Sequence, residues 1–402
     1  MRRAPITLQM TGVALLLGGC SGISSPDAGV WLSEDGVVWS QVESPALGGE
    51  GIQQMLDVVD FDDRLIAVGY TSVDEGADGR VWASTDAITW EAYDDPNLGG
   101  PEDQWIVAVT IAGPGLVAVG FEGRIEVGNF DTDAAIWTSS DGLDWDRAPP
   151  SRSLAGRDSR ELWAVAEFDN RIIAGGAVGR SAAIWTSTDG VGWSRVTGPN
   201  DFIASSNERA LIRGIAIGGP GVIAVGEADN DAAIWTSSDG ENWSKVNNPG
   251  VLGGEGTQGI ANVIDSQLGL VAVGFDMGGE SINFLGRGSE EDMNGVVWIS
   301  EDGLQWQRID TPDFGGPGFQ ELTDIAQWGN GLVAVGRDIP GGVRLDDPVA
   351  DVDAAIWFSE DGVAWSKIES RSLGGPDWQD IYGIAVSGSR LVAVGGDDSG
   401  SS

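Results

Sequence analysis

The sequence predicts an all-β fold, a β-propeller built from seven four-stranded antiparallel blades. Two repeated blocks predict it. The first, Ser-x-Asp-Gly-x-x-Trp, occurs seven times with one departure, an Ala in place of Gly, at residues 33–39, 84–90, 139–145, 187–193, 237–243, 300–306 and 359–365. The second is an apolar segment ending near Ala-Val-Gly, at 65–69, 116–120, 172–176, 222–226, 270–274, 332–336 and 391–395. Units of about 50 residues with four strands each are typical of propeller blades.

Each unit is expected to hold four strands, named A to D from the centre outward. Strand A is a short apolar segment such as 107–111 or 214–217, and strand B is the Ala-Val-Gly segment that follows a tight turn. The Trp block predicts the C–D hairpin. The chain opens with a C–D pair at 30–42 and closes with an A–B pair at 383–395. We therefore expect these two pairs to form one blade, which closes the ring and removes exposed sheet edges.

The first residues predict export rather than folded structure. Arg2 and Arg3 precede an apolar run too short to span a membrane, and Leu17-Gly18-Gly19-Cys20 follows. This segment resembles a bacterial lipobox, and Cys20 is the only Cys in the chain. The alternative is a secretory signal with a chance Cys. We expect a signal peptide at 1–19, lipidated Cys20 and a tether at 20–28, the propeller at 29–396 and a tail at 397–402. This arrangement predicts a lipid-anchored protein at the cell surface or in the periplasm.

The composition is strongly acidic, with 62 Asp and Glu against 22 Lys and Arg. Such a surface repels nucleic acid and anionic headgroups, so we expect no nucleic-acid partner and contact with the membrane through the lipid alone. Simple solubility in salt is one reason for the acidity, and a store of cations is the other. The chain has no His, which excludes imidazole catalysis and imidazole metal ligands. We expect a monomer without a cofactor.

The Ser-x-Asp-Gly-x-x-Trp repeat resembles the Asp box, or BNR repeat, of sialidases and related bacterial propellers, although it is one residue shorter between Gly and Trp. In a tight turn, Asp accepts backbone N–H groups and Gly supplies a positive φ. The resemblance implies that these turns are structural and lie on the face opposite an active site. The seven Asp residues, from Asp35 to Asp361, are therefore excluded as catalytic candidates.

A sialidase would need further residues. The resemblance implies an arginine triad, a Tyr nucleophile with a Glu partner, an acid/base Asp and an early Phe-Arg-Ile-Pro segment, and this segment is missing. The chain holds only three Tyr residues. Tyr93 is expected in an outer D strand and Tyr70 at the outer end of a B strand. Tyr382 is expected just before an inner strand and is the one Tyr we retain as a candidate.

The face formed by the D–A and B–C connections is the expected binding face, because its loops are long and variable. Loops 276–296 and 337–353 are the longest of them. A recurring Leu-Gly-Gly-x-x-x-Gln block in the D–A connections supplies the candidate ligand-binding residues at the mouth of the channel: Gln53, Gln104, Gln258, Gln320 and Gln379, with Arg160 in their place in one blade. In the irregular blade, counting forward gives Glu208 and counting back gives Ala210. The alternative is that each Gln only holds its own loop.

A third ring of residues precedes strand C: Asp27, Asp78, Asp133, Ser181, Asp231, Asn294 and Asp353. Carboxylate oxygens suit calcium, but these residues are also ordinary turn formers, so we assign no metal site.

Two functions remain. The first is a non-catalytic propeller that binds a glycan, peptide or protein on the D–A/B–C face. The second is a sialidase-like glycoside hydrolase that uses carboxylates and Tyr382.

Overall fold

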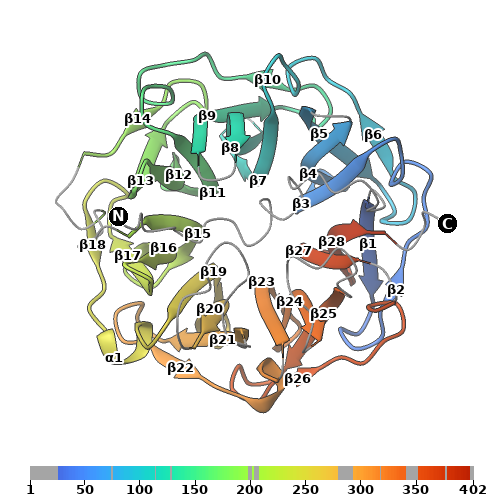
Figure 1. Ribbon diagram of the computed structural model, residues 1–402, viewed down its shortest axis with the longest axis vertical. Coiled ribbons are helices and arrows are strands. Elements are labelled where there is room, and N and C mark those ends of the chain that lie inside the picture. Colours follow the sequence, from blue (N-terminus) through green and yellow to red (C-terminus); the bar gives the residue numbers. More distant parts are fainter. Residues whose placement is uncertain are drawn as a thin grey trace, which may run out of the picture.

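The computed structural model describes residues 26–73, 76–113, 115–126, 129–197, 202, 208–278, 293–316, 318–340, 352–375 and 378–398. It is an all-β structure in which antiparallel sheets stand around a common centre (Figure 1). Strands β27, β3, β7, β11, β15, β19 and β23 lie innermost in this view. No helix among these residues has the length and apolar character that crossing a membrane would need.

The sheets follow one another along the chain, and each runs outward from an inner strand. From inner to outer strand, the first sheet consists of β3 (Ile52–Phe61), β4 (Arg64–Val73), β5 (Gly76–Ser84) and β6 (Glu91–Tyr93). The second consists of β7 (Gln104–Ala112), β8 (Gly115–Glu126), β9 (Asn129–Ser139) and β10 (Asp146–Arg147). The third consists of β11 (Arg160–Phe168), β12 (Arg171–Val178), β13 (Ser181–Ser187) and β14 (Ser194–Arg195). A fourth is β15 (Ala210–Gly218), β16 (Gly221–Ala228), β17 (Asp231–Ser237) and β18 (Trp243–Lys245).

Two further sets of strands are joined into one sheet by a single parallel pair, Met293 with Phe319. They are β19 (Thr257–Ser266), β20 (Gly269–Met277), β21 (Met293–Ser300) and β22 (Gln307–Ile309), and β23 (Gly318–Trp328), β24 (Gly331–Pro340), β25 (Asp353–Ser359) and β26 (Ser366–Lys367). One helical turn, α1 (Pro249–Leu252), and one 3₁₀ turn, Pro312–Phe314, lie in the connections that lead to them.

The remaining sheet contains both ends of the described chain. It consists of β27 (Gln379–Ser387), β28 (Arg390–Asp397), β1 (Asp27–Ser33) and β2 (Ser40–Gln41). Strands β1 and β28 pair antiparallel over seven residue pairs, from Asp27 with Asp397 to Ser33 with Leu391. Their pairing therefore begins and ends one or two residues beyond the limits of 29 and 396 that we expected from the repeats.

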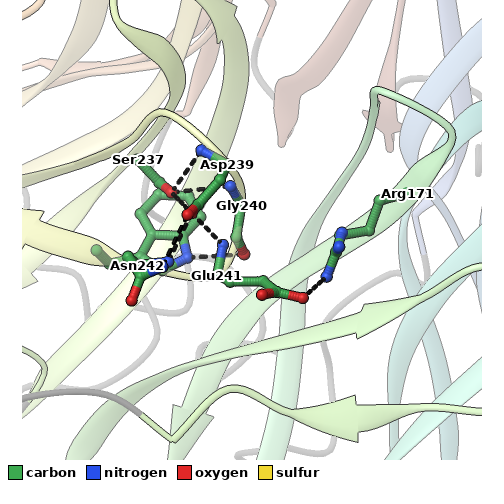
Figure 2. Close-up of polar contacts among 7 residues, drawn as sticks. Arg171, Ser237, Asp239, Gly240, Glu241 and Asn242 are labelled. Atoms are coloured by element: carbon green, nitrogen blue, oxygen red, sulfur yellow. Dashed lines mark hydrogen bonds and ion pairs between the residues drawn. The ribbon is translucent and has the colours of Figure 1, made fainter.

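The Ser-x-Asp-Gly-x-x-Trp turns hold the C–D hairpins through a recurring set of hydrogen bonds (Figure 2). In the turn after β17, Asp239 Oδ1 accepts the backbone N–H groups of Glu241 at 2.9 Å and Asn242 at 2.7 Å. Ser237 Oγ accepts the N–H of Gly240 at 2.8 Å, and the indole of Trp243 donates to the Gly240 carbonyl at 3.1 Å. These bonds favour the carboxylate, so they lower the pKa of Asp239.

A second Trp, eight residues before the Trp of the repeat as Trp31 is before Trp39, joins its sheet to the connection that precedes that sheet. Trp31 Nε1 donates to the Ser372 carbonyl at 2.6 Å, and the Ser372 hydroxyl donates to the Trp39 carbonyl at 3.0 Å. The same indole-to-loop bond joins Trp82 to Ala46 and Trp137 to Asn97. These ring nitrogens would otherwise be buried without a partner, so the bond both satisfies them and fixes the neighbouring sheet.

The apolar core lies between neighbouring sheets. One cluster joins Val119 and Ile136 of β8 and β9 to Leu162 and Ile172 of β11 and β12. Each sheet thus buries its faces against both neighbours, which is how a repeat protein extends its core along the chain.

Candidate functional site

The inner strand of every sheet carries a β-bulge at the same place. The pairing register shifts between Met55 and Asp57 in β3, for example, so that Leu56 has no partner in β4. The seven residues left out of register, which we call the bulge ring, are Leu56, Val107, Trp163, Arg213, Ala261, Thr323 and Tyr382. All seven are half-buried, although most of their neighbours on the inner strands are buried. A bulge re-aims a side chain out of the sheet, and here it does so beside the centre of the ring.

Asp380 lies two residues before Tyr382 and is 1% exposed. Its Oδ1 accepts hydrogen bonds from Gln54 Nε2 and from the Gly396 N–H, both at 3.1 Å, and its Oδ2 accepts one from Trp378 Nε1 at 3.0 Å. Burial raises the pKa of Asp380, while the charge of Arg337 and the hydrogen bonds from Tyr382, Trp378 and Gln54 act in the opposite direction. Burial outweighs these favourable interactions, and a buried carboxyl group with a raised pKa and a specific charged neighbour marks a candidate functional site.

Tyr382 stands two residues after Asp380 on β27, and the two side chains interact electrostatically. Burial, followed by the negative charge of Asp380, raises the pKa of Tyr382 well above its usual value of 10. The charge of Arg337 opposes this rise. The phenol is therefore protonated at neutral pH, and the charges of Asp380 and Arg337 act on it in opposite directions.

Arg337 belongs to β24, and it forms a buried ion pair with Glu321 of β23. The distance between Nη2 and Oε2 is 2.5 Å, and the side chains of both residues are less than a tenth exposed. Burial disfavours the charge of Arg337, but Glu321, Tyr382 and Asp380 together raise its pKa above the ordinary value. The two adjoining sheets thus bring Asp380, Tyr382, Glu321 and Arg337 into one electrostatically coupled cluster, which we call the Asp380 cluster.

An aromatic row continues from the Asp380 cluster across three sheets. The ring centroids of Tyr70 and Trp105 are 6.4 Å apart, those of Trp105 and Phe121 are 5.2 Å apart, and those of Phe121 and Trp163 are 5.6 Å apart. Burial and the charge of Asp380 raise the pKa of Tyr70, so the row and the cluster are coupled. Tyr70 lies in β4, the expected B strand, where it pairs with Gln54 of the inner strand and is 3% exposed.

The two irregular blades contribute two more arginine–glutamate pairs. Arg209 Nη2 lies 2.6 Å from Glu161 Oε2, and both side chains are almost fully buried. The same Glu161 oxygen accepts a hydrogen bond from Trp163 Nε1 at 3.1 Å. Arg213 stacks over the Trp163 ring at 5.9 Å and lies 3.3 Å from Glu227. Because its ion pair is long and its side chain is 14% exposed, Arg213 is the less tightly held of the two cations.

A second pair of carboxylates lies one residue beyond the bulge ring. Asp57 Oδ2 accepts the N–H of Val109 in the next sheet at 2.8 Å, and Asp324 Oδ2 accepts the N–H of Ile384 at 2.8 Å. Burial and the charge of Asp324 raise the pKa of Asp57 to about 7, and burial raises the pKa of Asp324 to about 6. Their backbone bonds explain their positions as structural links between sheets.

The predicted glutamines lie within the first residues of the inner strands, so our expectation that they precede these strands was wrong. Gln53 donates to the Glu50 carbonyl at 3.2 Å and to Thr71 Oγ1 at 2.8 Å. Gln258, Gln320 and Gln379 donate in the same way to Asp276, Asp338 and Asp397 of the adjacent strand, at 2.8, 2.7 and 3.0 Å. Gln104 occupies the equivalent position, opposite Glu122, and is fully buried. Such bonds are those expected of residues that hold their own loop and strand.

In the two blades that lack the recurring Gln, strand register shows which residue occupies its position. Ala210 pairs with Ala228 as Gln258 pairs with Asp276, so Ala210 occupies the Gln position. The alternative assignment of Glu208 to this position was wrong, because the extra residues of that loop shift the forward count. Arg160 does occupy the equivalent place in β11, and it donates to the Asp158 carbonyl at 2.7 Å.

The acidic ring before strand C fastens the D–A connections. Asp27 Oδ1 accepts the N–H of Gly49 at 3.3 Å, and Asp133 Oδ1 accepts that of Gly156 at 3.0 Å. The same bond recurs for Asp78 with Gly100 and Asp353 with Gly375. Among the described residues, no group of three or more Asp, Glu or Cys side chains is arranged to hold a metal ion.

Several predicted features lie outside the described residues. They are the signal segment with Cys20 and most of loops 276–296 and 337–353. Sequence reasoning also missed the bulge ring and Asp380. The sequence does contain a signal for the bulge ring: each bulge residue stands three positions after the Gln or its equivalent, as Tyr382 does after Gln379.

Comparison with known proteins extends the fold description. No family model and no curated protein sequence matches the chain. Among solved structures, the periplasmic gluconolactonase PpgL of Pseudomonas aeruginosa is similar, with a TM-score of 0.50 and 10% identity over 88% of this chain and 98% of the other. This chain is a β-propeller. The α-L-arabinofuranosidase Arb93A of Fusarium graminearum, solved with an iminosugar inhibitor, has a TM-score of 0.48 and 13% identity over 83% of this chain and 98% of the other.

Proposed function

We propose that this propeller is a glycoside hydrolase whose site is the Asp380 cluster. The carrying observation is the buried cluster in which Asp380 and Tyr382 of the inner strand β27 lie beside Arg337 of β24, which is itself paired with Glu321 of the inner strand β23. A nucleophile within hydrogen-bond reach of a base, with a third group that stabilises charge, is the arrangement that covalent catalysis requires. The resemblance of the repeats to sialidases supports the same class of reaction.

Each member of the cluster has a role in this proposal. Tyr382 Oη is the nucleophile that attacks the anomeric carbon while Asp380 takes the phenol proton; the glycosidic C–O bond breaks, and Asp380 passes that proton to the leaving oxygen. Water then displaces Tyr382 from the anomeric carbon, and its proton returns through Asp380 to the tyrosine oxygen. Arg337 stabilises the negative charge that develops on Oη, and Glu321 keeps the guanidinium in place through the 2.5 Å contact. Since the pKa of Tyr382 is raised, the phenolate forms only with Asp380 as acceptor, so both residues are needed.

The aromatic row provides the surface for a sugar ring. Trp163 is half-buried, whereas Trp105 and Phe121 behind it are almost fully buried and hold it from one side. A rigid indole supplies an apolar face suited to the C–H face of a sugar, and the neighbouring carboxylates and arginines supply hydrogen bonds to its hydroxyls.

Turnover of aryl glycosides, including a sialoside, tests the proposal. We expect Tyr382→Phe and Asp380→Asn each to lower kcat at least about a hundredfold, because each removes a group used in the chemical step. Tyr93→Phe is the matched control, since Tyr93 lies in the outer strand β6, where it donates a 2.6 Å hydrogen bond to Glu91. Folding of each variant is checked by tryptophan fluorescence. Unchanged turnover in both inner variants would show that the cluster is not catalytic.

A non-catalytic glycan-binding propeller is the second candidate. It is favoured by the saturation of Asp380, whose two oxygens already accept bonds from Gln54, Gly396 and Trp378. Calorimetric titration separates the two functions. Saturable binding of an oligosaccharide that is weakened by Trp163→Ala, together with no hydrolysis of any glycoside, would favour the binding protein.

We also propose that the propeller has seven blades and that the pairing of β1 with β28 closes the ring. The seven residue pairs between these strands and the bond from Trp31 to Ser372 support this closure. Deletion of residues 383–402 should then lower the unfolding temperature far more than removal of a tail, and an unchanged unfolding temperature would exclude it.

For its location, we infer that Cys20 is lipidated and anchors a monomeric domain at the outer face of a bacterial membrane or in the periplasm. The lipobox-like Leu17-Gly18-Gly19-Cys20 supports this inference. Metabolic labelling with a palmitate analogue should mark the native chain and spare Cys20→Ala.

A further inference from the structure

The described chain begins beside the Asp380 cluster. The Pro26 carbonyl accepts a hydrogen bond from the Gln53 N–H of β3 at 2.8 Å, and the side chain of the next residue, Gln54, donates to Asp380. Asp27 pairs with Asp397 at the end of β1 that is remote from the Asp-box turn at 33–39. The chain therefore joins the fold on the D–A/B–C face, on the side of the proposed site.

The length of the preceding segment limits how this face can be oriented. Six residues lie between Cys20 and Asp27, so seven residue steps join them, and a fully extended chain of that length spans at most about 25 Å. Strand β23 has 11 residues and, at 3.3–3.4 Å per residue, measures about 36 Å from one face to the other. A lipid on Cys20 could not reach round the thickness of the fold, so the D–A/B–C face could not turn away from the membrane.

We propose that the anchored protein holds its D–A/B–C face toward the membrane and acts on a glycan attached to the membrane surface. This inference rests on the proposed function and on the proposed lipid on Cys20. The tether leaves a gap of at most about 25 Å between the D–A/B–C face and the membrane. A bulky protein or a large free polysaccharide would have to enter this gap from outside, whereas a glycan attached to the membrane surface is already within it. The excess of acidic residues repels anionic headgroups, and this repulsion acts over about one Debye length, roughly 8 Å at physiological salt. It therefore keeps the D–A/B–C face from lying directly on the membrane.

The orientation is measured with a single introduced thiol, because Cys20 is the only Cys of the chain. Ser151→Cys places a label in the D–A connection after β10, and Ser140→Cys places one in the Asp-box turn of the same sheet. Both serines are exposed. The full lipidated chain is reconstituted in phosphatidylcholine vesicles, and energy transfer from the label to a headgroup acceptor is recorded. We expect higher transfer efficiency from residue 151 than from residue 140.

A longer tether provides the matched control. Insertion of 30 Gly and Ser residues between Ser25 and Pro26 gives a flexible linker of about 30 Å, which should remove most of the difference between the two labels. It should also speed action on a large soluble polymer and leave action on a small aryl glycoside unchanged. Equal or reversed transfer in the native chain, or no association with vesicles, would overturn the proposal. Transfer does not depend on hydrolysis, so an inactive protein with the expected difference would contradict only the proposed reaction.

Discussion

The aspartate pair beside the bulge ring predicts that stability falls as the pH rises from 5 to 8. The pKa of Asp57 rises from 3.8 to about 7 on folding, so the folded state binds a proton that the unfolded state has released. The contribution of Asp57 to the free energy of unfolding is therefore present at low pH and is lost as the pH rises from 4 to 7. Each pKa unit corresponds to about 1.4 kcal/mol, so the loss at Asp57 between pH 5 and pH 8 is about 2–3 kcal/mol.

Asp57→Asn removes this titration and tests its size. The amide nitrogen faces the N–H of either Val58 or Val109, so the variant is less stable at every pH by about 1–3 kcal/mol. That cost does not vary with pH. Urea unfolding followed by tryptophan fluorescence should therefore show that the wild type loses about 2–3 kcal/mol more than the variant between pH 5 and pH 8.

An exposed carboxylate serves as the control for net charge. Asp144→Asn removes one negative charge from an Asp-box turn and should leave the pH dependence of the wild type nearly intact. If Asp57→Asn and the wild type lose equal stability between pH 5 and pH 8, Asp57 is ionised in the fold at pH 5. The electrostatic account of this pair would then be wrong.

Two further changes test the framework. Ala87 replaces Gly in one Asp box and holds a φ of 63°, so Ala87→Gly should raise the free energy of unfolding by about 1 kcal/mol, measured by urea titration; a decrease would show that the turn is not strained. Arg209→Met leaves Glu161 buried without its cation and should cost about 3–5 kcal/mol, whereas the double change with Glu161→Leu should recover most of that loss. If the single and double variants lose equal free energy of unfolding, the unpaired charge of Glu161 is not the cause of the loss.

The repeat predicted the strands well because each blade solves the same local problem. The Asp-box residues, the paired Trp residues and the Ala-Val-Gly segment all act within one hairpin or against one neighbouring sheet, so their spacing alone carries the information. The inner strands were placed less accurately. In β7 we expected residues 107–111, and the strand runs from Gln104 to Ala112 with a bulge at Val107, because the bulge interrupts the alternation on which the prediction depended.

The candidate site was less predictable, because its members come from different blades and are not repeated. Tyr382 was singled out, yet Asp380, Glu321 and Arg337 were hidden among 62 acidic residues and many arginines of equal standing. Their significance arises from contacts across sheets, such as that of Gln54 with Asp380, which no local pattern encodes. The offset of three residues from each Gln would have identified the bulge ring, but not which of its members carry chemistry.

The difference between the recurring and the varying positions explains where chemistry can reside. Gln258 and Gln320 each bind an Asp of their own blade, and Asp133 and Asp353 each bind a glycine of the connecting loop, so these side chains are used by the framework. Three positions after each Gln, the same backbone geometry presents a side chain free to vary, from Ala261 to Arg213 to Tyr382. A framework that repeats provides a uniform set of half-buried positions, and under the proposed function only unequal residues at those positions give a bound sugar one preferred orientation. The site therefore depends on the symmetry of the framework and on the residues that break it.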